Sequence, residues 1–571
     1  MSAESSTADT LAESSPDDAM RDREQAETNA RVATATGVLA LGNIVSRVLG
    51  LARETVLTFL FGATGAVDAF QVAVIVPKAL YDLLIGGHVN SAIIPILSEV
   101  VTVKGREELW RLVSVLLSIV TVALAVLVLL LELFAPQVVQ VVSGGSSAST
   151  LVLATDLLRL TAPALIFLSW FAILSGTLYA LRIFTWPAFA GAVFNGSIVL
   201  VTLMFAPPLQ IVPVFGAGLP GLAVARPASG ITVVAVGWLV GALAQLALQS
   251  PGLRGGRFRL TLNWRHPAVS RIGRLYAPVM FSLVLDTLVI RTFSYNLASQ
   301  TGEGSIAYMN WATTLIQFPQ GLVATAISIA ILPTLARQAS LVVQNGPEMV
   351  RAFKDTLGLG LRLAIILILP ATVGLFALAT PIIGLIFEHG AFTTTDTGIT
   401  ALALRLYLIG LPFAALDLLL VYAFYARQDT LTPALIGALS LTAYMVIAVV
   451  LLPRFGLFSL MIADSVKHLI HATVSAYLLR RRLDGFGDQR LWSTGGKTLI
   501  AALAMGLVAW LTLPVLTDWI GTVGLLREAV LVIVSSGISG LVFLLVAIGL
   551  RIEEWRWLGG LIWGRIRRKS A

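Results

Sequence analysis

Residues 112–131 read LVSVLLSIVTVALAVLVLLL, an uninterrupted apolar run without a charged side chain. A helix of about 20 residues rises about 30 Å, which matches the hydrocarbon thickness of a bilayer. The run is therefore expected to cross a membrane as a helix.

The same pattern recurs along the chain, interrupted by Pro, Gly or charged residues. The predicted spans are 36–61, 68–98, 110–135, 155–181, 186–206, 230–249, 275–299, 306–335, 357–387, 399–425, 433–452, 457–479, 496–515 and 523–550. Only helices and closed barrels satisfy their backbone polar groups in lipid, and these runs are too long for barrel strands. The sequence predicts an all-α polytopic membrane protein with 14 transmembrane helices.

The composition supports this class. Of 571 residues, 57% are apolar and 12% are charged, and the mean hydropathy is +0.88. Soluble domains carry about twice that share of charge, so a soluble enzyme is excluded. The chain has no Cys and five scattered His, which excludes thiolate chemistry and disfavours a metal site.

Basic residues cluster between particular spans. Lys and Arg are frequent after the even-numbered spans and after the last span, and sparse after the odd-numbered ones. Because cytoplasmic loops carry an excess of Lys and Arg, both termini are predicted to be cytoplasmic. This topology accounts for the net charge of +8, so no nucleic-acid partner is expected.

The membrane region contains a weak internal repeat. The second span has Val76-Pro77 followed by SAIIPILSE (residues 91–99), and the eighth has Phe318-Pro319 followed by SIAILPTLAR (residues 328–337). Duplicated lobes with helices broken by Pro and Gly are typical of transporters. We expect two pseudo-symmetric six-helix lobes, residues 33–250 and 251–485, and two additional helices within residues 486–550.

The ends of the chain differ in charge from each other. Residues 1–32 contain eight acidic residues, three Arg and no aromatic side chain, and are predicted to be a disordered cytoplasmic tail. Residues 551–571 are basic and form the other predicted cytoplasmic tail.

Two arginines inside the first span indicate an anion site. In SRVLGLARE (residues 46–54), Arg47 and Arg53 are about 120° apart around the helix and about 9 Å apart along its axis. Ionisable groups at membrane depth usually face a bundle interior or an aqueous cavity. The planar guanidinium suits a phosphate or pyrophosphate. Alternatively, one Arg reaches the membrane surface and the other pairs with Glu54.

Further ionisable residues lie in later spans. Arg291 either pairs with Asp286 or faces the same cavity as Arg47. Asp464, Lys467, His468 and His471 allow a proton relay, although we expect Lys467 and His471 to reach toward the cytoplasmic surface. No ATP-binding loop occurs, so transport would draw on an ion gradient or the membrane potential.

Four motifs in this order resemble the MurJ/MviN lipid II flippase family of the multidrug/oligosaccharidyl-lipid/polysaccharide exporter superfamily. The first two are SRVLGLARETVLTFLFGATGAVDAF (residues 46–70) and IIPILSE (residues 93–99). The others, FEHGAFTTTDT (residues 387–397) and FYARQDTLTP (residues 424–433), are similar to the family's FERGAF and FYARQDT segments. The resemblance covers about residues 33–550.

The resemblance implies a transporter rather than an enzyme. It would move lipid II, an undecaprenyl-pyrophosphate-linked disaccharide-pentapeptide, to the outer leaflet of a bacterial plasma membrane for peptidoglycan synthesis. Alternating access of two lobes around a cationic cavity is implied, with the last two helices forming a groove for the lipid tail. Cell-wall synthesis or division proteins are expected partners besides membrane lipids, and no cofactor is expected. Coupling to Na⁺ or to the membrane potential stays open.

Site residues follow from both arguments. The head group is expected at Ser46, Arg47, Arg53 and Arg291. Gating or ion-pair roles are expected for Glu54, Asp68, Asp286 and Asp417. Hinges are expected at Gly86, Gly87 and Pro319, and no catalytic or metal-binding residue is expected.

The chain also departs from the family pattern. Tyr81 and Thr314 stand where the family has Arg, Gly86-Gly87 replaces an acid-Gly pair, and Asp417 replaces a Lys. Ser294 occupies a position where the family has an acid linked to sodium. These changes imply a divergent member with an altered head group or coupling ion. An exporter of another undecaprenyl-pyrophosphate-linked polysaccharide, a drug or ion antiporter, a membrane scaffold and a lipid-linked sugar enzyme are the alternatives, in decreasing order.

Overall fold

The computed structural model describes residues 16–84, 87–206, 210–215, 219–223, 230–259, 261, 269–271, 289–486, 489–521 and 524–554. Within these ranges, side chains are not described for residues 16–33, 35–36, 83–84, 87–92, 210–215, 219–223 and 342–345.

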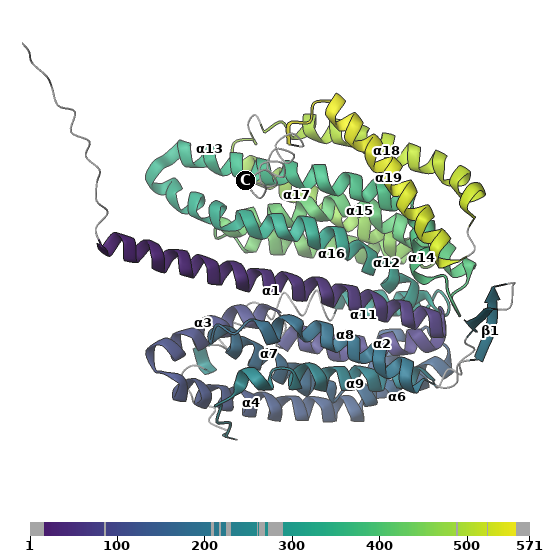
Figure 1. The fold of residues 1–571 in the computed structure, drawn as a ribbon, viewed down its shortest axis with the longest axis horizontal. Coiled ribbons are helices and arrows are strands. Elements are labelled where there is room, and N and C mark those ends of the chain that lie inside the picture. The colour runs from purple at the N-terminus through teal and green to yellow at the C-terminus, as the bar shows by residue number, and fades with distance from the viewer. Residues whose placement is uncertain are drawn as a thin grey trace, which may run out of the picture.

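The helices form two bundles with α1 along the boundary between them (Figure 1). The first bundle consists of α1 (Pro16–Phe61), α2 (Gly65–Leu84), α3 (Gly87–Val103), α4 (Arg106–Leu133), α5 (Ala135–Ser143), α6 (Ala148–Thr161), α7 (Ala164–Ala180), α8 (Thr185–Phe205) and α9 (Ile231–Ala247), followed by the short turn η2 (Ser250–Leu253). Its helix α1 packs mainly on α8.

The second bundle consists of α11 (Arg291–Ser299), α12 (Ser305–Pro319), the π-helix η4 (Gln320–Thr325), α13 (Ala326–Ala377), α14 (Ala379–Phe387), α15 (Thr394–Ala426), α16 (Leu431–Phe455) and α17 (Phe458–Arg482). Helix α13 is broken at Gly346, where φ is +53°. A C-terminal pair, α18 (Leu491–Ile520) and α19 (Leu525–Gly549), packs against the second bundle through α13 and α14.

Membrane-spanning helices dominate the described residues, but the predicted number of fourteen spans is not confirmed. Nine described helices are long and apolar enough to cross a membrane, or ten if α6 and α7, bent by 41°, count as one span. The predicted spans missing from that count include α1, α2 and α17, which carry several ionisable residues each. The seventh predicted span, 275–299, lies mostly outside the described residues.

One predicted span, the fourth, is a broken helix, because α6 ends at Thr161 and α7 begins at Ala164, with a bend of 41° between them. The second predicted span comprises α2 and α3, and residues 85 and 86 between these elements lie outside the described residues. A β-hairpin of β1 (Gln210–Phe215) and β2 (Leu219–Ala223), between α8 and α9, is an addition to the all-α prediction. Pro213 and Pro220 explain why this apolar stretch does not continue as a helix.

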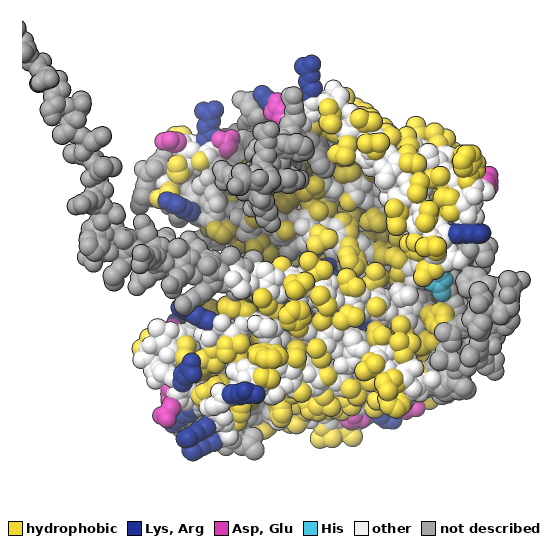
Figure 2. All heavy atoms as spheres, in the orientation of Figure 1, with side chains coloured by type: hydrophobic (Ala, Val, Ile, Leu, Met, Phe, Trp, Pro, Cys, Tyr) yellow, Lys and Arg dark blue, Asp and Glu magenta, His cyan; other side chains and the backbone are white. Residues whose placement is uncertain are grey.

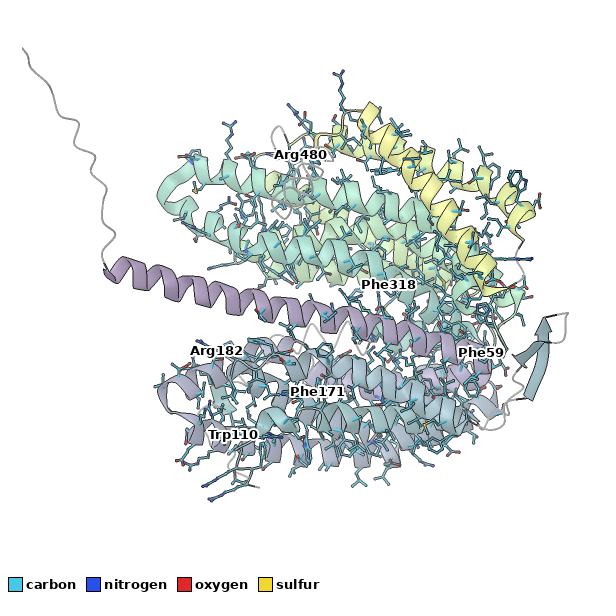
Figure 3. The ribbon with its side chains drawn as sticks, viewed as in Figure 1. Phe59, Trp110, Phe171, Arg182, Phe318 and Arg480 are labelled. Atoms are coloured by element: carbon cyan, nitrogen blue, oxygen red, sulfur yellow. The ribbon has the colours of Figure 1, made fainter. Side chains whose placement is uncertain are left out.

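The two ends of the bundles differ in charge. In Figure 2, dark-blue basic side chains gather mostly toward one end and yellow apolar side chains cover the sides. Figure 3 places Arg182 and Arg480 toward this basic end and Phe59 near the opposite end. We call these the basic end and the opposite end below.

Small residues bring α1 and α8 into close contact. A Cβ atom added to Gly42 would lie 2.2 Å from the carbonyl oxygen of Ala188, and one added to Gly191 would lie 2.4 Å from Ser46 Oγ. In lipid the hydrophobic effect does not drive helices together, and small residues such as these glycines promote association because they let the backbones pack closely. They fix α1, and with it the two arginines of the first span, against the first bundle.

This packing predicts that Gly42→Val destabilises the protein. The added side chain would overlap the α8 backbone, and overpacking of this kind costs about 1–3 kcal/mol. We expect a lower thermal midpoint in detergent, measured by fluorescence-detected aggregation. Gly37→Val is the matched control on the same helix, because a Cβ there has no neighbour within 4 Å. Equal midpoints for the two variants would contradict the packing argument.

Candidate functional site

A polar cavity of about 690 Å³ lies between the two bundles. The first bundle contributes residues of α1, α2, α7, α8 and α9, and the second contributes residues of α11, α12, α15, α16 and α17. Its charged lining residues are Arg47, Arg53, Glu54, Lys78, Asp82, Arg291 and Asp464. The cavity extends toward the basic end, because Gln245 lines it two residues before α9 finishes.

Arg47 reaches from the first bundle to the second. Its Nη1 donates to the carbonyl oxygen of Gln317 at 3.2 Å, and its buried Nε has no hydrogen-bond partner in the part of the chain that the structure describes. The acceptor lies just before Pro319, where α12 gives way to the π-helix. A Cβ on Gly321 would lie 2.7 Å from Arg47 Nη2, so glycine leaves room for the guanidinium.

Arg53 belongs to a polar chain that joins three helices. It donates from Nη1 to Asn195 Oδ1 at 3.0 Å and from Nε to Glu54 Oε1 at 3.1 Å. The buried Glu54 in turn accepts a hydrogen bond from Trp311 Nε1 at 3.1 Å. Asn195, Arg53, Glu54 and Trp311 therefore connect α8 through α1 to α12. The Arg53–Glu54 pair expected as one alternative is present, and Arg53 also lines the cavity.

Two further cations come from α2 and α11. Arg291 lines the cavity, which is one of the two placements that the sequence left open. Lys78, which the sequence argument passed over, lines it as well, about one helical turn from Tyr81. The sequence could have indicated this residue, because Lys78 is a charged side chain directly after Pro77 inside the predicted span 68–98. A cation is thus retained near the position where the family pattern has Arg and this chain has Tyr81.

The opposite end of the cavity is sealed by contacts between the bundles. The buried Asp68 accepts hydrogen bonds from the N–H groups of Gly304 at 2.7 Å and Ala307 at 2.9 Å, and thereby caps α12. The N–H of Ala391 donates to the carbonyl oxygen of Phe59 at 2.9 Å. Gly390 has φ +66°, and a Cβ there would lie 2.2 Å from the same oxygen.

The FEHGAFTTTDT motif builds this seal. Thr393 and Asp396 form a capping box at the start of α15, and Glu388 accepts hydrogen bonds from Thr394 Oγ1 at 2.7 Å and Thr397 Oγ1 at 2.6 Å. Three aromatic rings pack together at this motif. The ring of Trp311 lies 6.1 Å from that of Phe387 and 5.3 Å from that of Phe392.

The FYARQDTLTP motif also has a structural part. Asp429 accepts a hydrogen bond from the N–H of Thr432 at 3.0 Å, near the start of α16, and pairs with Arg482 of α17. Partial burial alone would raise the pKa of Asp429, but the contacts with Thr432 and Arg482 lower it to about 2. This carboxylate therefore holds a turn at the basic end and is not part of the cavity.

A second polar cluster occupies the interior of the second bundle. Asp417 pairs with His471, and Asp464 pairs with Lys467, whose ammonium lies 5.6 Å from the ring centre of Tyr444. The expectation that Lys467 and His471 reach toward the surface is wrong, because only 20% and 14% of their side chains are exposed. The partly buried carboxylates of Asp464 and Asp417 hold them inside instead.

The remaining predicted residues are spread over the fold. Ser46 lies against Gly191 of α8 and is not among the cavity residues, because the glycine leaves space for it there. Gly87 is the first residue of α3, and Pro319 ends α12. Asp286 and Gly86 lie outside the described residues. Within the described part of the chain, no group of three or more His, Cys, Asp or Glu is placed to hold a metal ion.

Comparison with known sequences identifies relatives over most of the chain. Residues 57–530 match a family described as lipid II flippase MurJ. A Burkholderia cenocepacia protein named lipid II flippase MurJ is 31% identical, with 77% of this chain and 82% of the relative covered. A Haemophilus influenzae protein named probable lipid II flippase MurJ is 29% identical, with 83% and 92% covered.

Solved structures share the fold. A structure described as lipid II flippase MurJ, inward closed conformation, superposes with a TM-score of 0.71 at 23% identity and covers 90% of this chain and 98% of its own. An inward-facing multidrug resistance MATE family transporter of the MOP superfamily has a TM-score of 0.60 at 14% identity, with 79% and 98% covered.

The seal predicts one-sided access to the cavity. The chain has no Cys, so an introduced cysteine is its sole thiol. We expect Thr314→Cys, in the cavity lining, to react with a membrane-impermeant maleimide applied to the basic end and to be protected from the opposite end. The measurement compares labelling in vesicles of the two orientations.

Two exposed positions provide the controls. Thr102→Cys marks the basic end and Ser149→Cys marks the opposite end. Labelling of Thr314→Cys to the same extent from both sides would contradict the sealed state.

Proposed function

The chain belongs to the MurJ family of lipid II flippases, and from this premise we propose that it moves lipid II from the inner to the outer leaflet of a bacterial plasma membrane. The observation that carries the proposal is a cavity between two bundles that is sealed at one end and lined by Arg47, Arg53, Lys78 and Arg291. We place the basic end and both termini in the cytoplasm, because Lys and Arg favour that side.

The two arginines of α1 differ in their hydrogen-bond partners. Arg53 is held by Glu54 and Asn195, which fixes its position in the wall. Arg47 has only a backbone carbonyl as partner and keeps an unused Nε donor. A pyrophosphate offers negatively charged oxygens to such a guanidinium, and two parallel hydrogen bonds form in the favoured geometry. Arg47 is therefore the proposed primary contact, with Lys78 and Arg291 completing the charge balance.

Alternating access requires the seal to open. We propose that Asp68 releases the start of α12, and that the Trp311–Glu54 contact breaks, when the cavity turns outward. The proposed hinges are Gly87, the first residue of α3, and Pro319, where α12 gives way to the π-helix. The polyprenyl tail would stay in lipid along the C-terminal pair. Asp417, paired with His471, is a proposed ion pair inside the moving bundle.

Another lipid-linked glycan is the second candidate substrate. Tyr81 and Thr314 line the cavity where the family pattern has Arg, so the head group meets neutral hydroxyl groups there. An undecaprenyl-pyrophosphate-linked polysaccharide would use the same arginines for its pyrophosphate. A drug antiporter for cations fits less well, since like charges in the cavity would repel its substrate.

The membrane potential is the proposed driving force. With a bound pyrophosphate the cavity carries more negative charge than when it is empty and cationic. An interior-negative potential would therefore favour outward movement of the loaded site and inward return of the empty one. Each charge that crosses the whole field gains about 2.3 kcal/mol per 100 mV.

Arg47→Ala is expected to reduce flipping strongly. Loss of charge-assisted hydrogen bonds costs about 1.5–3 kcal/mol, which corresponds to a decrease of about tenfold or more. The measurement is the outer-leaflet accessibility of lipid II to an added cleaving enzyme, in cells depleted of their own flippase. Arg337→Ala, at an exposed position of α13, is the control and should flip like the unmodified chain.

The result separates the candidates. Normal exposure of lipid II by Arg47→Ala would overturn the cationic site. If the unmodified chain reaches the membrane and exposes no lipid II, the other lipid-linked glycan becomes the substrate to test.

Flipping is also expected to respond to voltage without sodium. In vesicles with a potassium diffusion potential, an interior-negative potential should accelerate flipping in Na⁺-free medium, because the transported pyrophosphate is anionic. Collapse of the potential with an ionophore is the control. A rate that depends on a Na⁺ gradient and not on voltage would contradict this driving force.

A further inference from the structure

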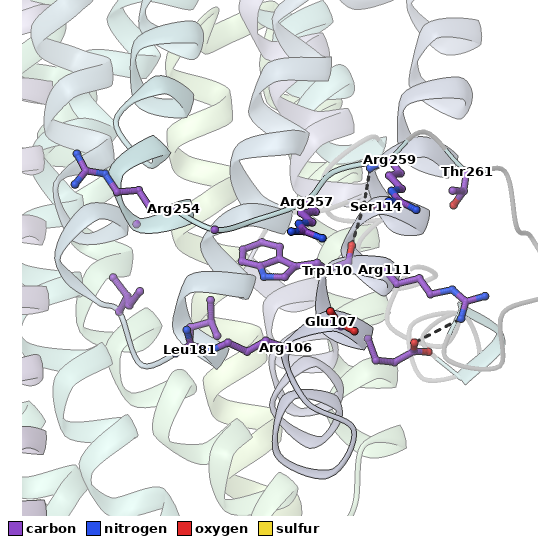
Figure 4. A pocket seen from close by; sticks show the side chains of 14 residues that line it. Arg106, Glu107, Trp110, Arg111, Ser114, Leu181, Arg254, Arg257, Arg259 and Thr261 are labelled. Carbon is purple, nitrogen blue, oxygen red and sulfur yellow. Dashed lines mark hydrogen bonds and ion pairs between the residues drawn. The ribbon is translucent and has the colours of Figure 1, made fainter.

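A second cavity lies at the basic end of the first bundle and has a volume of about 720 Å³. It is formed by the first turns of α4, residues 181 and 183 after α7, and residues from 252–259 and 261 (Figure 4). It shares no lining residue with the cavity between the bundles. The proposed transport cycle gives it no part.

Five arginines surround this pocket, against two glutamates. They are Arg106, Arg111, Arg254, Arg257 and Arg259, all exposed, and the glutamates are Glu107 and Glu108. Of the five guanidinium groups, only that of Arg111 has an ion pair among the described residues, with Glu108 at 3.7 Å. Cations gathered without counter-charges repel one another, and a bound anion would relieve that repulsion.

The backbone that carries three of these arginines is fixed on α4. The N–H of Arg259 donates to Ser114 Oγ at 3.1 Å, and the N–H of Thr261 donates to Ser118 Oγ at 3.1 Å. The ring of Phe258 meets the ring of Trp110 edge-on at 5.5 Å. Arg254, Arg257 and Arg259 are thus presented by an anchored segment, as Figure 4 shows.

The pocket also contains an unused hydroxyl group. Thr261 Oγ1 is buried, belongs to a pocket-lining residue and has no hydrogen-bond partner among the described residues. Buried polar atoms are normally satisfied, so an unpaired one suggests a missing partner. A phosphate oxygen would accept its hydrogen bond.

The position of the pocket along α4 indicates the source of the phosphate. Helix α4 starts at Arg106 and continues into a highly apolar stretch whose Val122, Val126 and Leu129 are exposed on the lipid-facing side. Trp110 lies in the second turn, the depth at which aromatic belts mark the membrane interface. Phospholipid phosphates lie at this level, and basic pockets on the cytoplasmic side of membrane helices bind such head groups.

We propose that this pocket binds the phosphate of an anionic phospholipid of the cytoplasmic leaflet. The guanidinium groups of Arg254, Arg257 and Arg259 supply the charge, and the Thr261 hydroxyl supplies a further donor. The bound lipid would join the start of α4 to the segment 252–261 that follows α9 and η2.

The test uses the full-length protein in a neutral detergent and native mass spectrometry. Phosphatidylglycerol and phosphatidylcholine are added separately, and retained lipids are counted. The unmodified chain is expected to retain phosphatidylglycerol preferentially. Combined Arg254→Gln, Arg257→Gln and Arg259→Gln should weaken this retention by about tenfold or more, since each basic residue contributes separately to anionic lipid binding.

The matched control removes three charges elsewhere on the cytoplasmic side. Arg337→Gln, Arg351→Gln and Arg480→Gln replace exposed arginines of the second bundle. Retention of phosphatidylglycerol should stay unchanged in this variant. Thermal midpoints measured without added lipid check that both variants are folded.

Three outcomes would overturn the proposal. The first is equal retention of phosphatidylglycerol by the two triple variants, and the second is equal retention of both lipids by the unmodified chain. The third is displacement of the lipid by inorganic pyrophosphate at equal concentration, which would assign the pocket to a soluble phosphate.

Discussion

The buried carboxylate of Glu54 is the constraint on which the arrangement of the bundles depends. A charge at this depth is costly unless it is paired and hydrogen-bonded. Glu54 obtains one partner, Arg53, from its own helix and the other, Trp311, from the second bundle. Both hydrogen bonds that offset the desolvation of Glu54 are present only while α1 and α12 stay in contact. Loss of the contact with Trp311 leaves an unsatisfied carboxylate oxygen, so this hydrogen bond favours the arrangement in which the two bundles are in contact.

Residues of the signature motifs form the seal at the opposite end of the cavity as well as part of its cationic lining. Phe59 follows the arginines in the first motif, and Gly390 and Ala391 belong to the FEHGAF motif more than 300 residues later. Their backbones meet at the seal, where a side chain at Gly390 would overlap the Phe59 carbonyl. Asp68 joins the same region by capping α12. In this chain the two motifs therefore fix both the cavity and the end at which it closes.

Apolar runs predicted the helices, since lipid requires the same pattern everywhere. The arginines of the first span were found for the converse reason, as charges are rare there. Lys78 was missed because the search for charges within the second span did not include the residue directly after Pro77. Trp311 as partner of Glu54 was not accessible, because spacing along one helix carries no information about a neighbour 257 residues away. Ser46 was misplaced for the same reason, since its orientation depends on a glycine in α8.

Arg47 connects substrate binding to the movement of the bundles. In the sealed state its guanidinium donates across the interface to the carbonyl of Gln317. An anion that takes this donor removes one link between α1 and α12 while adding charge to the cavity. A ligand shifts a conformational equilibrium only by its difference in affinity for the two states. Competition for Arg47 provides such a difference, because the pyrophosphate binds best where the guanidinium is free of Gln317. The Gln317 carbonyl, which the proposed substrate would displace from Arg47, lies in the last turn of α12, directly before the π-helix, and π-helical turns are frequent at functional sites.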